Sequence, residues 1–150
     1  MADKETVSVL NELIVTAEDG ENGFKEAAEI AEDPRLKSLF AECARECKTA
    51  HVELQSRVKA LGGEAKDHGS VAGAAHRGWI KVKAAVENKD IAVLEEVERG
   101  EDRAKAAYTK ALKANLPPDI KALVQKQHDG ALRNHDRIRD LRNEFKAAHR

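Results

Sequence analysis

The chain lacks the sequence signatures by which many enzymes and cofactor-binding domains are recognised. It contains no catalytic-triad arrangement, no glycine-rich phosphate loop and no Cys-x-x-Cys motif. These absences argue against hydrolase, nucleotide-binding and thiol-redox functions. We therefore assign no catalytic residues and expect no organic cofactor. With two cysteines among 150 residues, the chain is not a disulfide scaffold either.

Net charge and long hydrophobic runs are also missing. The 26 basic and 27 acidic side chains give a net charge of −1, so no overall field favours nucleic acid or a membrane surface as partner. No apolar run approaches the roughly 20 residues that a membrane-spanning helix requires. The N-terminal sequence MADKETVSVL is charged where a signal peptide would be apolar, which predicts a cytoplasmic protein. In that reducing compartment, Cys43 and Cys47 are expected to be small buried side chains, not a disulfide.

The composition and the helix punctuation indicate an all-α protein. Charged residues make up 35% of the chain and aromatic residues 3%, as is typical of long-helix proteins. Asp33 and Pro34 end one helix and begin the next, Gly62 and Gly63 end the second, and Ser70 can cap a shorter one. Further along, Asp90 is expected to cap a helix, and Pro117 with Pro118 makes a tight connection. The predicted helices span 4–32, 34–61, 71–87, 91–114 and 118–147.

The lengths of the connections predict the fold. Short turns make two antiparallel hairpins of the four long helices, and a long crossover with its own short helix joins them. This is the arrangement of a ferritin-like four-helix bundle, which we expect to form a single domain over residues 1–150.

Ionisable residues interrupt the apolar face of each long helix near its middle. In the first helix the apolar series Val7, Leu10, Ile14, Ala17 continues with Glu21 before it returns to apolar residues. At about 1.5 Å per residue, the interruptions fall within about two turns of one another. Unpaired buried carboxylates are costly, and carboxylate with imidazole suits iron, manganese or zinc. The candidate metal ligands are Glu21, Glu46, His51, Glu98, Glu101, His128 and His135.

The pattern departs from a complete two-metal site. Such bundles use Glu-x-x-His on two helices, whereas Glu46 and His51 are five residues apart and Gln125 precedes His128. A single metal, an incomplete site or a site shared across subunits would each fit these residues.

Several linked motifs extend from about Leu10 to Arg142. They read LNELIVTAEDGENGFKEAAE, ELQSRVKALGGE, GSVAGAAHRGW, ERGED and HDRIRDLR. With these motifs the chain resembles an uncharacterised bacterial family of ferritin-like four-helix-bundle proteins, classed as a domain of unknown function. The resemblance implies the ferritin-like fold and no particular reaction. The family's recurring acidic and histidine positions correspond here to Glu18 or Asp19, Glu53, His76, Glu98, Glu101, Asp102 and His135.

Two function hypotheses follow. The first is a cytoplasmic ferritin-like protein that binds a transition metal, with metal handling or oxidative-stress protection as its role. The second is a metal-free helical bundle that acts in stress or interaction through oligomerisation or partner binding. In either case we expect a homo-oligomer, with a dimer among the states left open.

Two smaller features also give expectations. Gly20 and Gly23 are expected to let a neighbouring backbone approach closely. His76, Arg77 and Trp79 are expected to dock the crossover helix through Trp79, or else to cover an opening to the polar level.

Overall fold

The chain folds into five α-helices. The computed structural model describes the backbone of residues 2–149 and the side chains from Lys4 to His149. The helices are α1 (Ala2–Ile30), α2 (Pro34–Ala60), α3 (Val71–Val86), α4 (Lys89–Leu112) and α5 (Pro118–Ala148). Residues 2–149 contain no β-strand. The predicted ranges differ from these bounds by two residues or fewer, and the all-α class is confirmed. None of the helices so described is both long and apolar enough to cross a membrane.

Local capping explains most of the helix boundaries. The Asp33 side chain accepts a hydrogen bond from the backbone N–H of Arg35, and Pro34 occupies the first turn, as predicted. Ser70 caps α3 by accepting from the N–H of Gly73. Both caps lie within a few residues of the groups that they satisfy, so the sequence alone is sufficient to predict them.

The predicted cap at Asp90 is wrong. The side chain of Asn88 caps α4 instead, accepting from the N–H of Ile91 at 3.0 Å. The Asp90 carboxylate accepts from the backbone N–H groups of Glu32 at 2.7 Å and Asp33 at 3.2 Å. Asp90 therefore ties the start of α4 to the α1–α2 turn, a contact between residues more than fifty positions apart.

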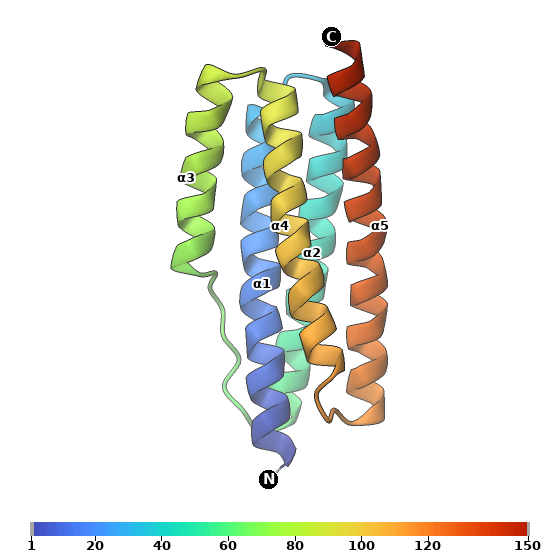
Figure 1. Cartoon of the computed structure of the whole chain (residues 1–150). Helices are drawn as coiled ribbons and strands as arrows, with labels where there is room; N and C mark the ends of the chain where they lie inside the picture. The colour runs from blue at the N-terminus through green and yellow to red at the C-terminus, as the bar shows by residue number, and fades with distance from the viewer. Residues whose placement is uncertain (1, 150) are drawn as a thin grey trace.

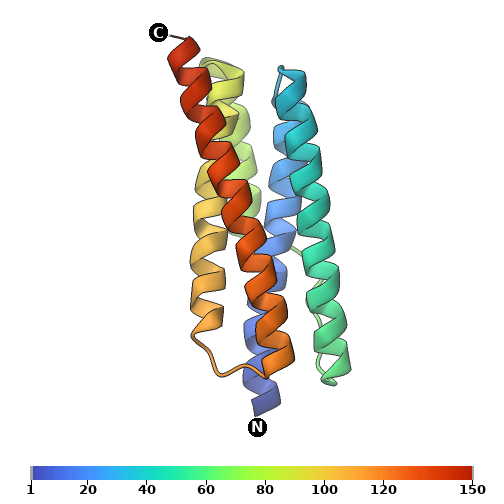
Figure 2. The ribbon, with the colours of Figure 1, turned by 90° about the vertical axis from the view of Figure 1, so that its right-hand side faces the viewer.

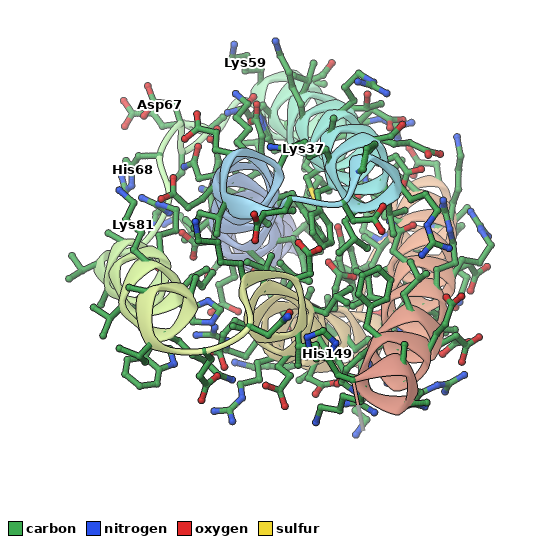
Figure 3. All side chains as sticks on the ribbon, turned by 90° about the horizontal axis from the view of Figure 1, so that it is seen from above. Lys37, Lys59, Asp67, His68, Lys81 and His149 are labelled. Atoms are coloured by element: carbon green, nitrogen blue, oxygen red, sulfur yellow. The ribbon has the colours of Figure 1, made fainter. Side chains whose placement is uncertain are left out.

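The helices form a bundle in which α1 and α4 are central. α1 packs against α2 and α4, and α4 packs against α5, whereas the backbones of α2 and α5 rarely approach closely and these helices are joined by side chains such as Asn134 and Glu46. α3 lies outside this group against α1 and α4, beside only one half of their length (Figure 1). The view along the bundle shows α3 at the edge formed by α1 and α4 (Figure 3). Figure 2 shows the backbones of α2 and α5 set apart from each other, and polar side chains connect the two helices.

The hydrophobic core is divided into two clusters along the bundle. One lies near the α1–α2 turn and includes Phe24, Leu36, Phe40, Leu94 and Ile138. The other lies toward the opposite end and includes Leu10, Ile14, Leu54, Tyr108 and Val124. Residues 17–23 of α1, 47–51 of α2, 98–104 of α4 and 127–135 of α5 fall between the two clusters. We call this stretch the mid-bundle level.

The crossover helix α3 is docked through residues other than Trp79. The Trp79 side chain is 50% exposed, so the prediction that it anchors the helix is wrong. Ile80 and Ala84 are buried against the bundle instead. At the start of α3, the N–H and hydroxyl of Ser70 donate to Asp19 at 2.8 and 2.6 Å.

Candidate metal centre

Glu18, Glu21 and His51 form a close group between α1 and α2. Glu18 and Glu21 are three residues apart and share one face of α1, and His51 faces them from α2. Nδ1 of His51 lies 3.3 Å from Oε1 of Glu18, and Nε2 lies 2.7 Å from Oε1 of Glu21. Nδ1 also lies 3.4 Å from Oε1 of Gln55. The imidazole is therefore held between two carboxylates.

Burial and partners together set the charge of Glu21. Glu21 and His51 are each 7% exposed. Burial by itself raises the pKa of Glu21, but hydrogen bonds from Lys25 and His51 outweigh it, so the net pKa lies below the ordinary value of 4.5. Lys25 Nζ lies 2.8 Å from Oε2 of Glu21. Glu21 is thus ionised at neutral pH and presents a negative charge to His51.

This group has the chemistry of a metal site. Each of the three residues offers one ligand atom, and these atoms all lie within 4.8 Å of one another. Carboxylate oxygen and imidazole nitrogen are ligands that iron, manganese and zinc share. The group could hold such an ion. Within the described residues, no other set of His, Cys, Asp and Glu side chains meets the same criterion.

The remaining candidate ligands lie in other groups. His135 Nε2 lies 2.8 Å from Oδ1 of Asp102 and 3.9 Å from Oε2 of Glu98, at the contact between α4 and α5. Arg142 forms a close ion pair with the same Glu98. This arrangement is a charge network with a cation already in place, and the role of Glu98 and His135 as metal ligands stays a prediction.

Glu46 is exposed and Glu101 is buried, and no hydrogen bond or ion pair joins either of them to a histidine among the described residues. Oε2 of Glu46 accepts from the Asn134 side chain at 2.6 Å. Glu101 is 5% exposed, and its Oε2 has no hydrogen-bond partner among the described residues. Burial, and then repulsion by Glu46 and Asp102, raise the pKa of Glu101 to about 8. Without a bound cation, the Glu101 carboxyl is therefore mostly protonated at neutral pH. The roles of Glu46 and Glu101 as metal ligands stay predictions.

His128 stands apart from the other candidate ligands. Its ring lies 6.4 Å from that of Tyr108, and its Nδ1 has no hydrogen-bond partner within the described part of the chain. The nearest carboxylate oxygen recorded for it, Oδ1 of Asp129, lies 4.0 Å away. The structure thus brings Glu21 and His51 together and places the other five candidates elsewhere.

The residue-by-residue derivation missed two acidic residues. Glu18 was identified by family resemblance but not as a ligand, although its position three residues before Glu21 places both on one helical face. Glu96 is 1% exposed and contacts His76 Nε2 at 3.1 Å and Lys83 Nζ at 2.9 Å. Its partners belong to α3, so only the docking of that helix reveals the pairing.

The two glycines of α1 differ from expectation. A Cβ atom at Gly20 would lie 2.9 Å from Sγ of Cys47, so the close neighbour is a side chain and not a backbone. A Cβ atom at Gly23 would meet nothing within 4 Å, because this position faces open space. Cys43 and Cys47 are free thiols, as predicted, and burial raises the pKa of both.

Fold and site together define the class of this protein as an all-α bundle with a group of two carboxylates and one imidazole between its first two helices. Residues 5–114 match the model of the family described as Domain of unknown function (DUF2383), and the chain belongs to that family. The match covers α2, α3 and α4 completely and includes Glu18, Glu21 and His51. A search of curated proteins found no match.

Proposed function

We infer that this chain is a ferritin-like protein that binds a divalent transition metal through Glu18, Glu21 and His51. The observation that carries this inference is the mutual approach of three ligand atoms, from two carboxylates and one imidazole, at a buried helix contact. Four long helices joined by a crossover that carries α3 support the ferritin-like assignment.

The donor set narrows the choice of metal. Two oxygen ligands and one nitrogen ligand suit iron, manganese and zinc, and the general order of affinities places manganese as the weakest of the three. Three protein ligands leave coordination positions open for water or another small molecule, as in catalytic metal sites. We therefore propose metal handling or protection against oxidative stress as the role, with iron, manganese or zinc as the ion.

A metal-free interaction protein is the second candidate function. α3 exposes Val71, Trp79, Val82 and Val86, four large apolar side chains that fall on one face of the helix. In this function the Glu18–His51–Glu21 contacts would only fix the register of α1 on α2, and α3 would make a homo-oligomer or partner contact.

Metal titration of the purified chain tests the first function. Zn²⁺, Mn²⁺ and, under anaerobic conditions, Fe²⁺ would each be titrated by calorimetry into the unmodified chain and two variants. We expect one ion per chain, loss of that binding in His51→Ala, and retention in His135→Ala, which removes an imidazole from the α4–α5 network. Equal binding by His51→Ala and the unmodified chain, or no stoichiometric binding, would overturn the assignment.

A further inference from the structure

A cavity that is partly open to solvent lies at the mid-bundle level, and its lining does not include Glu18, Glu21 or His51. Its volume is about 650 Å³, and all five helices contribute to its lining. This volume lies within the usual range of small-molecule sites. Small residues at inward positions leave the space unfilled, namely Ala17, Gly20, Gly23, Ala50, Gly100, Ala104, Gly130 and Ala131.

The helix arrangement explains why these residues do not collapse onto one another. The two core clusters lie on either side of the level, and between them long polar side chains bridge α5 to α2: Gln127 donates to the carbonyl of Ala50 and Asn134 donates to Glu46. Apolar side chains such as Phe24, Ile80 and Val97 form part of the wall. The cavity is therefore suited to the apolar body of an organic molecule.

Two residues of the cavity lining, Glu101 and Arg77, each have a buried polar atom without a hydrogen-bond partner among the described residues, and Glu101 is the acidic one. Its side chain is among the lining residues, it is 5% exposed, and its Oε2 makes no hydrogen bond to any described residue. A buried polar atom left without a partner is costly, and structures that retain one commonly use it. A ligand that donates a hydrogen bond to this oxygen would remove the cost.

The charges around Glu101 favour a cation. Glu46 of α2 and Asp102 of α4 both act on it as negative charges, and Lys105 of α4 opposes them more weakly. The thiols of Cys43 and Cys47 on α2 are neutral because burial raises their pKa. The cavity residues of α1 next to this level include Gly20 and Gly23, which carry no charge.

The other charged residues of the lining lie on several helices and are of mixed sign. On α5 these are Lys126 and Arg133, beside the neutral Asn134, and on α3 it is Arg77, whose Nη1 is buried without a hydrogen-bond partner among the described residues. His76 of α3 is neutral at neutral pH because burial lowers its pKa. Asp19, Glu42, Arg45, Glu53 and Arg103 complete the charged lining. Because these charges are of both signs, the group of a ligand that meets Glu101 is selected by the acidic neighbours Glu46 and Asp102, whereas Arg77 would select an acceptor group elsewhere on the ligand.

We propose that this cavity binds an organic amine, with its apolar body against the small-residue wall and its protonated amino group paired with the carboxylate of Glu101. On binding, the Glu101 carboxyl gives up its proton to solvent and the ammonium group donates to the freed oxygen. The site shares no residue with Glu18, Glu21 and His51, so it is independent of the metal.

Three probes of equal chain length test the proposal. Decylammonium, decanol and decanoate differ only in the head group, and each would be titrated at pH 7 below its micelle concentration. We expect decylammonium to bind at least tenfold more tightly than the other two, and Glu101→Gln to remove that preference. Tighter binding of decanol or decanoate, or an unchanged preference in Glu101→Gln, would overturn the proposal.

A pair of glycine variants tests the location. Gly23→Leu places a side chain where a Cβ meets nothing within 4 Å, inside the cavity, whereas Gly78→Leu does the same on α3 away from the cavity lining. Both gain helix propensity, so they are matched. We expect Gly23→Leu to lose decylammonium binding and Gly78→Leu to keep it; equal binding by both would overturn the assignment. Circular dichroism measures whether each variant folds. Metal titration of Glu101→Gln distinguishes a failure of the amine-binding proposal from a failure of the metal-site assignment.

Discussion

Glu21 and Glu101 are two carboxyl groups of one bundle level with similar exposed fractions and opposite shifts in pKa. They are 7% and 5% exposed. Burial raises the pKa of both, but Glu21 has Lys25 and His51 as partners and its net pKa is lowered. Glu101 has only negative neighbours nearby apart from Lys105, and its pKa is raised to about 8. Depth of burial and partners together therefore set the charge: burial is the largest cause of the raised pKa of Glu101, whereas the cationic partners of Glu21 outweigh its burial.

The comparison separates two uses of the same residue type. A carboxylate that is ionised and faces an imidazole is prepared for a metal ion. A carboxyl group that keeps its proton in an apolar cavity is prepared to interact with an organic group instead. A glutamate on the apolar face of a bundle helix thus predicts a functional position, and its neighbours indicate which function.

The largest expected effect is that of Glu101→Gln, which should change how the free energy of unfolding depends on pH. The folded chain binds more protons at Glu101 than the unfolded chain between the ordinary pKa of 4.5 and about 8. The free energy of unfolding therefore falls as pH rises through this window. Glutamine cannot ionise, so we expect the variant to be more stable than the unmodified chain by about 4 kcal/mol at pH 8 and by only about 1 kcal/mol at pH 5.

Urea unfolding at the two pH values measures this difference. Glu21→Gln is the matched control, because the lowered pKa of Glu21 contributes stability that is present above pH 4.5 and lost as pH falls below it. That variant should be less stable than the unmodified chain at both pH values. A stability difference for Glu101→Gln that does not change with pH would contradict the raised pKa.

Metal binding at Glu18, Glu21 and His51 should stabilise the folded chain, and this gain should not depend on Glu101. At a free Zn²⁺ concentration one hundred times the dissociation constant, the gain is about 2.7 kcal/mol. We expect this gain in the unmodified chain and in Glu101→Gln, and its reversal by a chelator. Thermal unfolding with and without Zn²⁺ measures it, and a gain that survives in His51→Ala would place the ion elsewhere.

His51→Ala should destabilise the metal-free chain by about 2 kcal/mol at pH 7. The variant removes the imidazole that Glu18 and Glu21 share and leaves two carboxylates facing each other at a helix contact. Urea unfolding in the presence of a chelator isolates this effect from metal binding. Gln55→Ala, which removes only the 3.4 Å contact to Nδ1, should cost much less. Equal losses in the two variants would show that the carboxylates do not depend on the imidazole.

Local sequence signals predicted the helices of this fold well, and long-range pairing explains what they missed. Pro34, Ser70 and the proline pair at 117–118 act within one or two turns of their own position. Asp90 was misassigned because its partners, the N–H groups of the α1–α2 turn, are far away in sequence. Trp79 was expected to be buried, but the rotation of α3 buries Ile80 instead.

The candidate site was predicted in part for the same reason. The apolar series identified Glu21 and placed His51 on the face of its helix that packs inward. Which residues meet depends on how each helix is rotated about its axis, and a shift of one residue turns a side chain by about 100°. The sequence could therefore predict where Glu101 lies along the bundle axis. It could not predict that Glu101 is separated from the histidines among the candidate metal ligands.

The smallest expected effect is that of Lys25→Met on the Zn²⁺ affinity, and it tests how charge acts at the metal site. The exposed ammonium of Lys25 holds Oε2 of Glu21 at 2.8 Å, so it competes with a metal ion and repels it. An exposed ion pair contributes little, so we expect Zn²⁺ to bind only about threefold more tightly in the variant. Lys110→Met removes the same charge at the Glu12 pair and should leave the Zn²⁺ affinity unchanged. Raising the salt concentration should reduce the Lys25→Met effect, because screening weakens the same repulsion. Weaker Zn²⁺ binding in Lys25→Met would mean that Lys25 positions Glu21 for the ion. Lys25, a cationic partner that Glu101 lacks, would then be part of the metal site.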